Sequence, residues 1–205
     1  PMTQNQQETP TVFIVDDDPA IRFAMQALMD SVNIEHEIYS SGDEFLESVD
    51  DHRAGCLVLD IRMPGLGGLE LQEELIKRDS TLPIIFITGH GDVPMAVDAM
   101  QKGAVDFIQK PVRDQDLLDR IREALKTDAE RREEQQKHAE VAERLDRLTN
   151  REREVFDLVV TGKPNKVIAY ELGVSQRTVE IHRARVMEKM QARSLADLVK
   201  MHMTA

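Results

Sequence analysis

Short apolar runs alternate with amphipathic segments over the first 125 or so residues, and this alternation most restricts how the chain can fold. Five runs have the length and composition of strands: TVFIV, EHEIY, CLVLD, PIIFIT and VDFI, of which the half-polar EHEIY is the weakest. Between them, apolar residues recur at helical spacing, as in Ile21, Met25 and Leu28. Apolar strands separated by helices predict an α/β fold, a doubly wound five-stranded parallel sheet covered on both faces.

Polar residues follow four of the five expected strands. Asp16 and Asp17 follow the first strand, and Asp60, Thr88 and Lys110 stand at the ends of the third, fourth and fifth. In the flavodoxin-like strand order the first and third strands are neighbours, and ligands bind where the order reverses. Carboxylates gathered there repel one another unless a cation neutralises them, and Mg²⁺ prefers oxygen ligands. With a lysine and a hydroxyl beside them, the pattern predicts a site for phosphoryl transfer.

Each of these residues also has an ordinary structural role open to it. Asp16 and Asp17 could begin a polar loop, and Asp60 could start an Asx turn. Thr88 is a common strand residue, and most lysines are simply solvated. Asp18 is expected to cap the helix that follows it. Joint placement at the strand ends is therefore what favours the phosphoryl-transfer site.

Four stretches occur in a fixed order: VFIVDDDP, LVLDIRMPG, FITGHGD and DFIQKP. Together they resemble the signature stretches of the receiver domain of two-component response regulators. The resemblance implies that Asp60 accepts a phosphoryl group and helps to bind Mg²⁺, for which Mn²⁺ could substitute. It implies that Asp17 binds the metal directly, Asp16 directly or through water, and Arg62 through its backbone carbonyl.

The same resemblance implies that Thr88 and Phe107 form a switch pair and that Lys110 contacts the phosphoryl oxygens, with a cis bond to Pro111. Phe107 could equally be core packing. A sensor histidine kinase would supply the phosphoryl group by in-line transfer. Such a protein catalyses only its own phosphorylation and dephosphorylation, so it is not expected to be a classical enzyme. An aspartyl-phosphate phosphatase is the alternative, but it usually has a second Asp where this chain has Arg62.

The end of the chain differs in charge from the rest. From Thr149 onward there are ten Lys and Arg against seven Asp and Glu, a net charge of +3. Because the whole chain has a net charge of −12, the residues before Thr149 have a net charge of −15. This asymmetry predicts two domains with different partners. No apolar run approaches the ~18 residues of a membrane span, the polar start lacks a signal-peptide core, and the single cysteine lies in an apolar run. We therefore expect a cytoplasmic protein without membrane contact.

Helix signals in this last part predict a helix-turn-helix. Thr149 and Glu152 have the spacing of a capping box ahead of an apolar-periodic segment. Gly173 stops a short second helix and Ser175 caps a longer third one. Two helices joined by a tight turn that contains glycine are typical of the helix-turn-helix. A final helix is expected over 194–203.

The third of these helices has two distinct sides. Val179, Val186 and Met190 fall together and are expected in the core. The other side, with the start of the preceding helix, supplies the candidate DNA contacts: Asn165, Lys166, Arg177, Thr178, Glu180, Ile181 and Arg185. Outward Arg and hydroxyl groups suit the major groove, and a helix start suits phosphate. A protein-docking module and an RNA-binding domain are the alternatives, although no aromatic platform for RNA is visible.

The last 55 or so residues resemble the LuxR-type DNA-binding domain of NarL/FixJ-class regulators. The resemblance rests on LTNREREV, NKVIAYELGVSQRTVEIHR and EKM, and the earlier stretch TGHGDVPMAVDAM is similar to the FixJ branch. Glu180 stands where some relatives have Lys, so a base preference does not transfer.

These observations predict four segments: a disordered arm over 1–10, a receiver over 11–125, a charged helical linker over 126–147 and a LuxR-type helix-turn-helix domain over 148–205. The linker is expected to be a solvated spacer helix because its apolar seam is broken. We expect a phosphorylation-controlled transcription regulator, an activator, that forms a homodimer when phosphorylated. Its expected partners are a histidine kinase, a double-stranded DNA operator and RNA polymerase.

Overall fold

The computed structural model describes residues 9–50, 52–89 and 92–204, and these described residues divide between 131 and 132 into two compact units. Most of the arm expected over 1–10 lies outside the described residues, so that expectation stays a prediction. Among the described residues, every helix is too short or too polar to cross a membrane.

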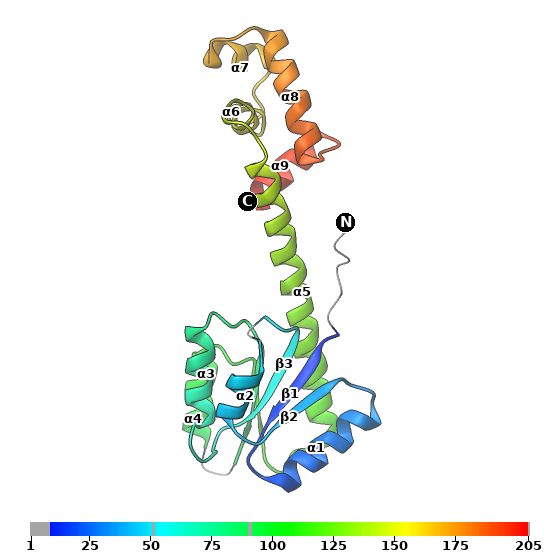
Figure 1. Ribbon diagram of the computed structural model, residues 1–205, viewed down its shortest axis with the longest axis vertical. Coiled ribbons are helices and arrows are strands. Elements are labelled where there is room, and N and C mark those ends of the chain that lie inside the picture. Colours follow the sequence, from blue (N-terminus) through cyan, green and yellow to red (C-terminus); the bar gives the residue numbers. More distant parts are fainter. Residues whose placement is uncertain (1–8, 51, 90–91, 205) are drawn as a thin grey trace. The chain divides into compact units, whose positions relative to one another are not determined.

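A five-stranded parallel sheet forms the centre of the first unit (Figure 1). The strands are β1 Thr11–Val15, β2 His36–Tyr39, β3 Gly55–Asp60, β4 Ile84–Thr88 and β5 Asp106–Gln109. Their order across the sheet is β2-β1-β3-β4-β5, so the direction of winding reverses between β1 and β3. All five expected strands are present, β2 included, which confirms the doubly wound parallel fold. The carboxyl ends of β1 and β3 meet at the reversal, where such sheets bind ligands.

Helices cover both faces of this sheet (Figure 1). They are α1 Pro19–Ser31, α2 Gly42–Ser48, α3 Gly68–Lys77, α4 Val93–Gln101 and α5 Asp114–Asp146. Successive strand residues point to opposite faces. Phe13 and Val15 accordingly pack with α2, α3 and α4, whereas Val12 and Ile14 pack with α1 and the first part of α5. Asp18 caps α1 by accepting from the Ala20 N–H at 2.8 Å, as its position predicted.

The second unit contains the end of α5 and four further helices: α6 Asn150–Val159, α7 Asn165–Leu172, α8 Gln176–Met190 and α9 Leu195–Thr204. Thr149 and Glu152 form the expected capping box, Gly173 ends α7 in the left-handed conformation, and Ser175 caps α8. The three helix signals read from the sequence are therefore confirmed. Residues expected to form the linker are helical up to Asp146, because α5 continues without a break.

Candidate phosphorylation site and DNA-binding face

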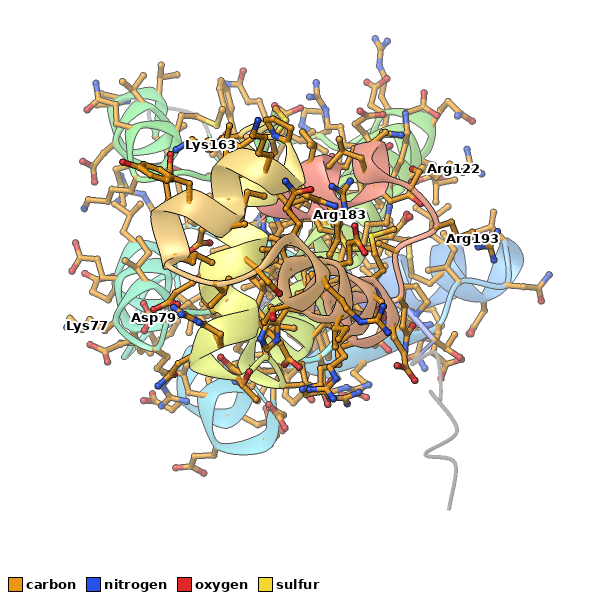
Figure 2. All side chains as sticks on the ribbon, turned by 90° about the horizontal axis from the view of Figure 1, so that it is seen from above. Lys77, Asp79, Arg122, Lys163, Arg183 and Arg193 are labelled. Atoms are coloured by element: carbon orange, nitrogen blue, oxygen red, sulfur yellow. The ribbon has the colours of Figure 1, made fainter. Side chains whose placement is uncertain are left out.

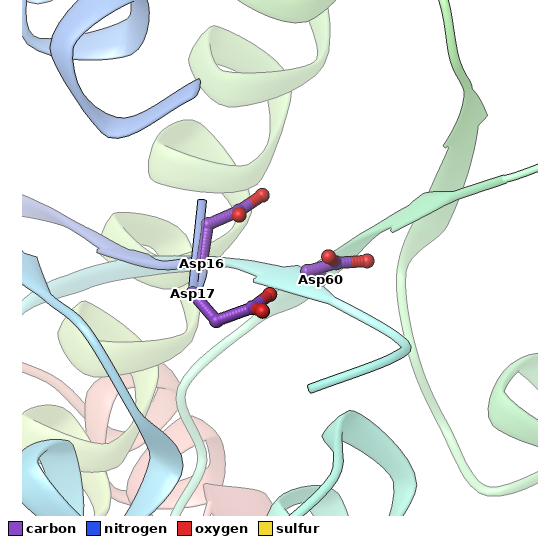
Figure 3. A group of neighbouring side chains, drawn as sticks. All are labelled: Asp16, Asp17 and Asp60. Carbon is purple, nitrogen blue, oxygen red and sulfur yellow. The ribbon is translucent and has the colours of Figure 1, made fainter. Parts of the chain in front are cut away.

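Three carboxylates meet where the order of the sheet reverses. Asp16 follows β1 and Asp60 ends β3, and because these strands are paired their ends lie side by side. With Asp17 they form a group in which one carboxylate oxygen from each residue lies within 4.8 Å of the other two (Figure 3). Asp16 and Asp60 are buried and Asp17 is exposed. The cluster is thus open to solvent on one side and fixed by the sheet on the other.

Asp16 shows what this crowding costs. Its Oδ1 accepts from the Asp18 N–H at 2.8 Å, but its buried Oδ2 has no hydrogen-bond partner among the described residues. Burial raises the pKa of Asp16, the Asp18 N–H opposes that rise, and the neighbouring Asp60 carboxylate adds to it. A buried carboxylate oxygen without a donor, facing two more carboxylates, fits the all-oxygen ligand set of a divalent cation such as Mg²⁺.

Lys110 brings a positive charge to the cluster from the end of β5. Its Nζ lies 3.3 Å from Asp60 Oδ2 and 3.8 Å from Asp16 Oδ2. The backbone N–H of Lys110 donates to the Thr88 carbonyl at 2.8 Å, which ties the ends of β4 and β5 together. The Lys110–Pro111 bond is cis, as the receiver resemblance implied. An ammonium group is therefore held beside the carboxylate that would accept a phosphoryl group.

Thr88 and Phe107 lie on neighbouring strands near this edge. Thr88 is buried, and its hydroxyl donates to the Ile108 carbonyl over a long 3.4 Å. Phe107 is half-buried and packs against the core beneath α2, α3 and α4. In this structure the Thr88 hydroxyl is thus engaged with β5, and the Phe107 ring is not fully enclosed.

Arg62 does more than the sequence predicted. The resemblance assigned it only a backbone carbonyl, but its guanidinium pairs with the carboxylate of Asp92, the residue just before α4. Asp92 is buried and also accepts from the Gly89 N–H at 3.0 Å. Sequence reasoning missed this pair, because nothing in the local pattern joins residues 30 positions apart.

Gly68 lets α3 begin close to Asp60 at the end of β3. A Cβ added there would lie 2.4 Å from the Asp60 carbonyl oxygen and 2.9 Å from Ile61 Cα. Both atoms belong to the backbone, so they could move away from a Cβ only if the strand end itself shifted. The glycine after the Pro-Gly turn is therefore required by the close approach of α3 to the end of β3.

In the second unit, α8 separates buried from exposed residues as its periodicity predicted. Val179, Val186 and Met190 are fully buried. Four of the candidate DNA contacts are exposed on α8: Arg177, Glu180, Ile181 and Arg185. Lys166 is exposed at the start of α7. These side chains are therefore available to a partner.

Two other candidates already have partners within the unit. The Thr178 hydroxyl lies 2.8 Å from the Ser175 hydroxyl at the start of α8, and Thr178 is half-buried. Asn165 Oδ1 accepts at 3.0 Å from Nη1 of Arg183, which is labelled in Figure 2, and this hydrogen bond joins α7 to α8. The sequence predicted Asn165 only as a candidate DNA contact and did not predict this structural role, because no local pattern joins residues 18 positions apart.

Two family models match this chain. Residues 12–122 match the model described as "Response regulator receiver domain", and residues 146–202 match "Bacterial regulatory proteins, luxR family". Nodulation protein W of Bradyrhizobium diazoefficiens is 49% identical over 193 residues, which is 94% of this chain and 85% of that protein. Transcriptional regulatory protein FixJ of Azorhizobium caulinodans is 43% identical, with 97% of this chain and 94% of that protein covered.

Solved structures give the same result. The response regulator StyR is 44% identical, with a TM-score of 0.89, 96% of this chain and all of that chain covered. Full-length FixJ from B. japonicum is 39% identical, with a TM-score of 0.61 and coverage of 97% and 98%. The likeness therefore extends over both units of the chain.

Proposed function

This chain belongs to the transcriptional response regulators that join a receiver domain to a LuxR-type DNA-binding domain, and we propose that phosphorylation of Asp60 controls its binding to DNA. One observation carries the proposal. At one edge of the sheet, one oxygen from each of three carboxylates lies within 4.8 Å of the other two, and the Lys110 ammonium lies 3.3 Å from Oδ2 of Asp60. Family membership implies a histidine kinase as the phosphoryl donor and DNA as the target of the output domain.

In the proposed reaction a carboxylate oxygen of Asp60 attacks the phosphorus of a phosphohistidine on the kinase. The new P–O bond forms as the P–N bond breaks, and the imidazole nitrogen leaves with the electron pair. Lys110 offsets negative charge on the phosphoryl oxygens. Asp16, Asp17, Asp60 and the Arg62 carbonyl would hold Mg²⁺ or Mn²⁺, which supplies further positive charge to those oxygens. Water later removes the phosphoryl group, and we propose no other catalytic activity.

The proposed signal passes through Thr88 and Phe107. The Thr88 hydroxyl donates over 3.4 Å to the Ile108 carbonyl, which is a weak hydrogen bond. Phosphoryl oxygens on Asp60 are stronger, charged acceptors, so the hydroxyl would turn toward them. Phe107, which is only half-buried, would then rotate into the space that the hydroxyl leaves. This is a two-position element of the kind that phosphorylation can bias.

The proposed output is a helix in the major groove. Arg177, Glu180, Ile181 and Arg185 are exposed along α8, which can approach base edges from its outer side. Lys166 at the start of α7 would contact phosphate, with Asn165 and Thr178 contributing from positions already fixed by internal hydrogen bonds. We propose that phosphorylated protein forms a homodimer on two half-sites and activates transcription through RNA polymerase.

The segments proposed for these functions are a receiver at 11–125, a linker at 126–147 and a DNA-binding domain at 148–205. Selection of bound duplexes from random DNA, with and without acetyl phosphate, tests the function directly. We expect one dyad-symmetric sequence to be enriched, and more strongly with the phosphodonor. Equal binding to RNA and duplex DNA in a gel-shift series, or enrichment that the phosphodonor leaves unchanged in both wild type and Asp60→Asn, would contradict the proposal.

A further inference from the structure

A buried carboxylate lies on α5 beyond residue 122, where the match to the receiver family model ends. Asp128 is 2% exposed, and its Oδ2 accepts from the backbone N–H of Gly55 at 3.0 Å. Gly55 is the first residue of β3. The contact therefore joins the start of the expected linker to the central strand of the receiver.

The geometry of Gly55 explains why this acceptor matters. Gly55 has a φ of 150°, and a Cβ there would lie 1.8 Å from the Thr11 carbonyl oxygen, so β1 and β3 are closely packed at this point. Two residues after Gly55 in β3, the Leu57 N–H donates to the Pro83 carbonyl on the β4 side of the sheet. A buried backbone N–H needs an acceptor. Asp128 supplies one to Gly55 from outside the sheet.

Arg131 is a second partner of Asp128. Its Nη2 lies 2.8 Å from Asp128 Oδ1, and the same guanidinium donates to the Thr81 carbonyl in the loop between α3 and β4. A buried carboxylate is stable when it is both paired and hydrogen-bonded. Asp128 has both kinds of partner, and through Arg131 the helix is also held to a second part of the receiver.

We propose that Asp128 anchors the start of the linker helix to the receiver, and that control of DNA binding by Asp60 depends on this anchor. The inference rests on the proposed function. Strand β3 begins at Gly55, which donates to Asp128, and ends at Asp60. One buried strand thus links the phosphoacceptor to the helix that leads out of the receiver. Asp128 is a positioning residue, since it lies at the opposite end of β3 from the phosphoryl site.

Asp119 offers a matched control on the same helix. It pairs with Arg122 (labelled in Figure 2) with the same three-residue spacing, at 3.5 Å, but both side chains are more than half exposed. We therefore compare full-length wild type, Asp128→Ala, Asp128→Asn and Asp119→Ala. Asp128→Asn keeps an oxygen that can accept from Gly55 but loses the ion pair with Arg131.

Two measurements test the anchor. Hydrogen exchange reports protection of the amides at 126–131, and titration of a selected duplex reports the gain in affinity caused by acetyl phosphate. In Asp128→Ala we expect exchange at 126–131 to rise at least about tenfold, and the phosphorylation-dependent gain to fall at least about fivefold, the lower end of typical coupling between sites. Asp128→Asn should lie between Asp128→Ala and wild type. The phosphorylated fraction of Asp60 and the affinity without phosphodonor should stay within about twofold of wild type.

The opposite results are equally distinct. If Asp128→Ala lowers the melting temperature but keeps the wild-type gain, or loses protection no more than Asp119→Ala, the anchor has no role in control. If Asp128→Ala does not fold, Asp128→Asn decides by the same two measurements. If wild type itself shows no gain with acetyl phosphate, the proposed function fails, and a rise in exchange at 126–131 equal to that of Asp119→Ala would overturn the anchor independently.

Discussion

The receiver gathers its candidate functional groups from several strand ends into one cluster, whereas the DNA-binding domain spreads most of its candidate contacts along α8. Asp60 and Lys110 are 50 positions apart in the sequence, yet their oxygen and nitrogen atoms lie 3.3 Å apart. Arg177 and Arg185 lie on the same helix and both are exposed. Groups that meet in space act as a unit, but groups along a helix act one by one. The arrangement of the first site by itself indicates a chemical reaction, whereas the role of each exposed side chain on α8 depends on the DNA that it contacts.

Removal of the proposed phosphoacceptor, Asp60, tests the cluster with the largest expected effect. Asp60→Asn should lower the phosphorylated fraction with acetyl phosphate by at least about a thousandfold, because an amide cannot serve as the nucleophile. Phosphate-affinity electrophoresis measures that fraction. Lys110→Met should also lower it strongly, and the double variant should be no worse than Asp60→Asn, since the two groups act as a unit.

Asp119→Asn, an exposed change on α5, is the control for this series and should phosphorylate normally. Substantial phosphorylation of Asp60→Asn at another site, or a double variant with the product of the two single effects, would show that the cluster is not one functional unit.

For α8, by contrast, we expect the proposed DNA contacts to act independently of one another. Arg177 and Arg185 are eight positions apart, about 12 Å along a helix, so substitutions there should combine additively. Each change to Ala should cost about 1–3 kcal/mol of binding free energy if the side chain reads a base. Fluorescence anisotropy with the selected duplex gives the free energies of the single and double variants. A coupling energy above about 0.5 kcal/mol would mean that the two arginines share one contact.

Substitution of two lysines distinguishes a direct contact with DNA phosphate from an effect of net charge on DNA affinity. Lys166 is exposed at the start of α7. Lys163, which is labelled in Figure 2, instead donates to both carboxylate oxygens of Glu171 at 2.8 Å. Lys166→Ala should weaken binding to every duplex about equally and lower the slope of log affinity against log salt by about one. Lys163→Ala removes the same formal charge and should leave that slope nearly unchanged. Equal slopes for both variants would assign the effect to net charge.

The same contrast governs what could be predicted from the sequence. Strands, helix caps and the convergence of Asp16, Asp17 and Asp60 followed from local patterns and from one rule about parallel sheets. Contacts that cross the fold did not follow, because no local pattern marks them. The Arg62–Asp92 pair and the hydrogen bond from Gly55 to Asp128 are of this kind. A buried aspartate inside a charged helical segment looks like its exposed neighbours until the helix is docked.

Substitution of Glu152 is expected to have the smallest effect, and it tests the stability of the DNA-binding domain, not its binding to DNA. Its carboxylate is buried, accepts from the Thr149 N–H at 2.9 Å and pairs with Lys189 Nζ at 2.5 Å. The hydrogen bond from Lys189 lowers the pKa of Glu152 below its usual value, despite burial. A lowered pKa in the folded state means that the carboxylate stabilises the fold above its unfolded pKa of about 4.3. That contribution is lost as the pH falls through the lower folded pKa.

Thermal unfolding of the full-length chain between pH 3 and 7 should therefore show a smaller loss of stability on acidification for Glu152→Gln than for wild type. The substitution should also lower stability at pH 7, where the ion pair is intact. Glu154→Gln is the control, because Glu154 pairs with Arg151 on the exposed surface of the same helix, where such a pair contributes about 0–1 kcal/mol. If wild type and Glu152→Gln lose stability in parallel, the ion pair between α6 and α8 does not govern the acid sensitivity of the DNA-binding domain.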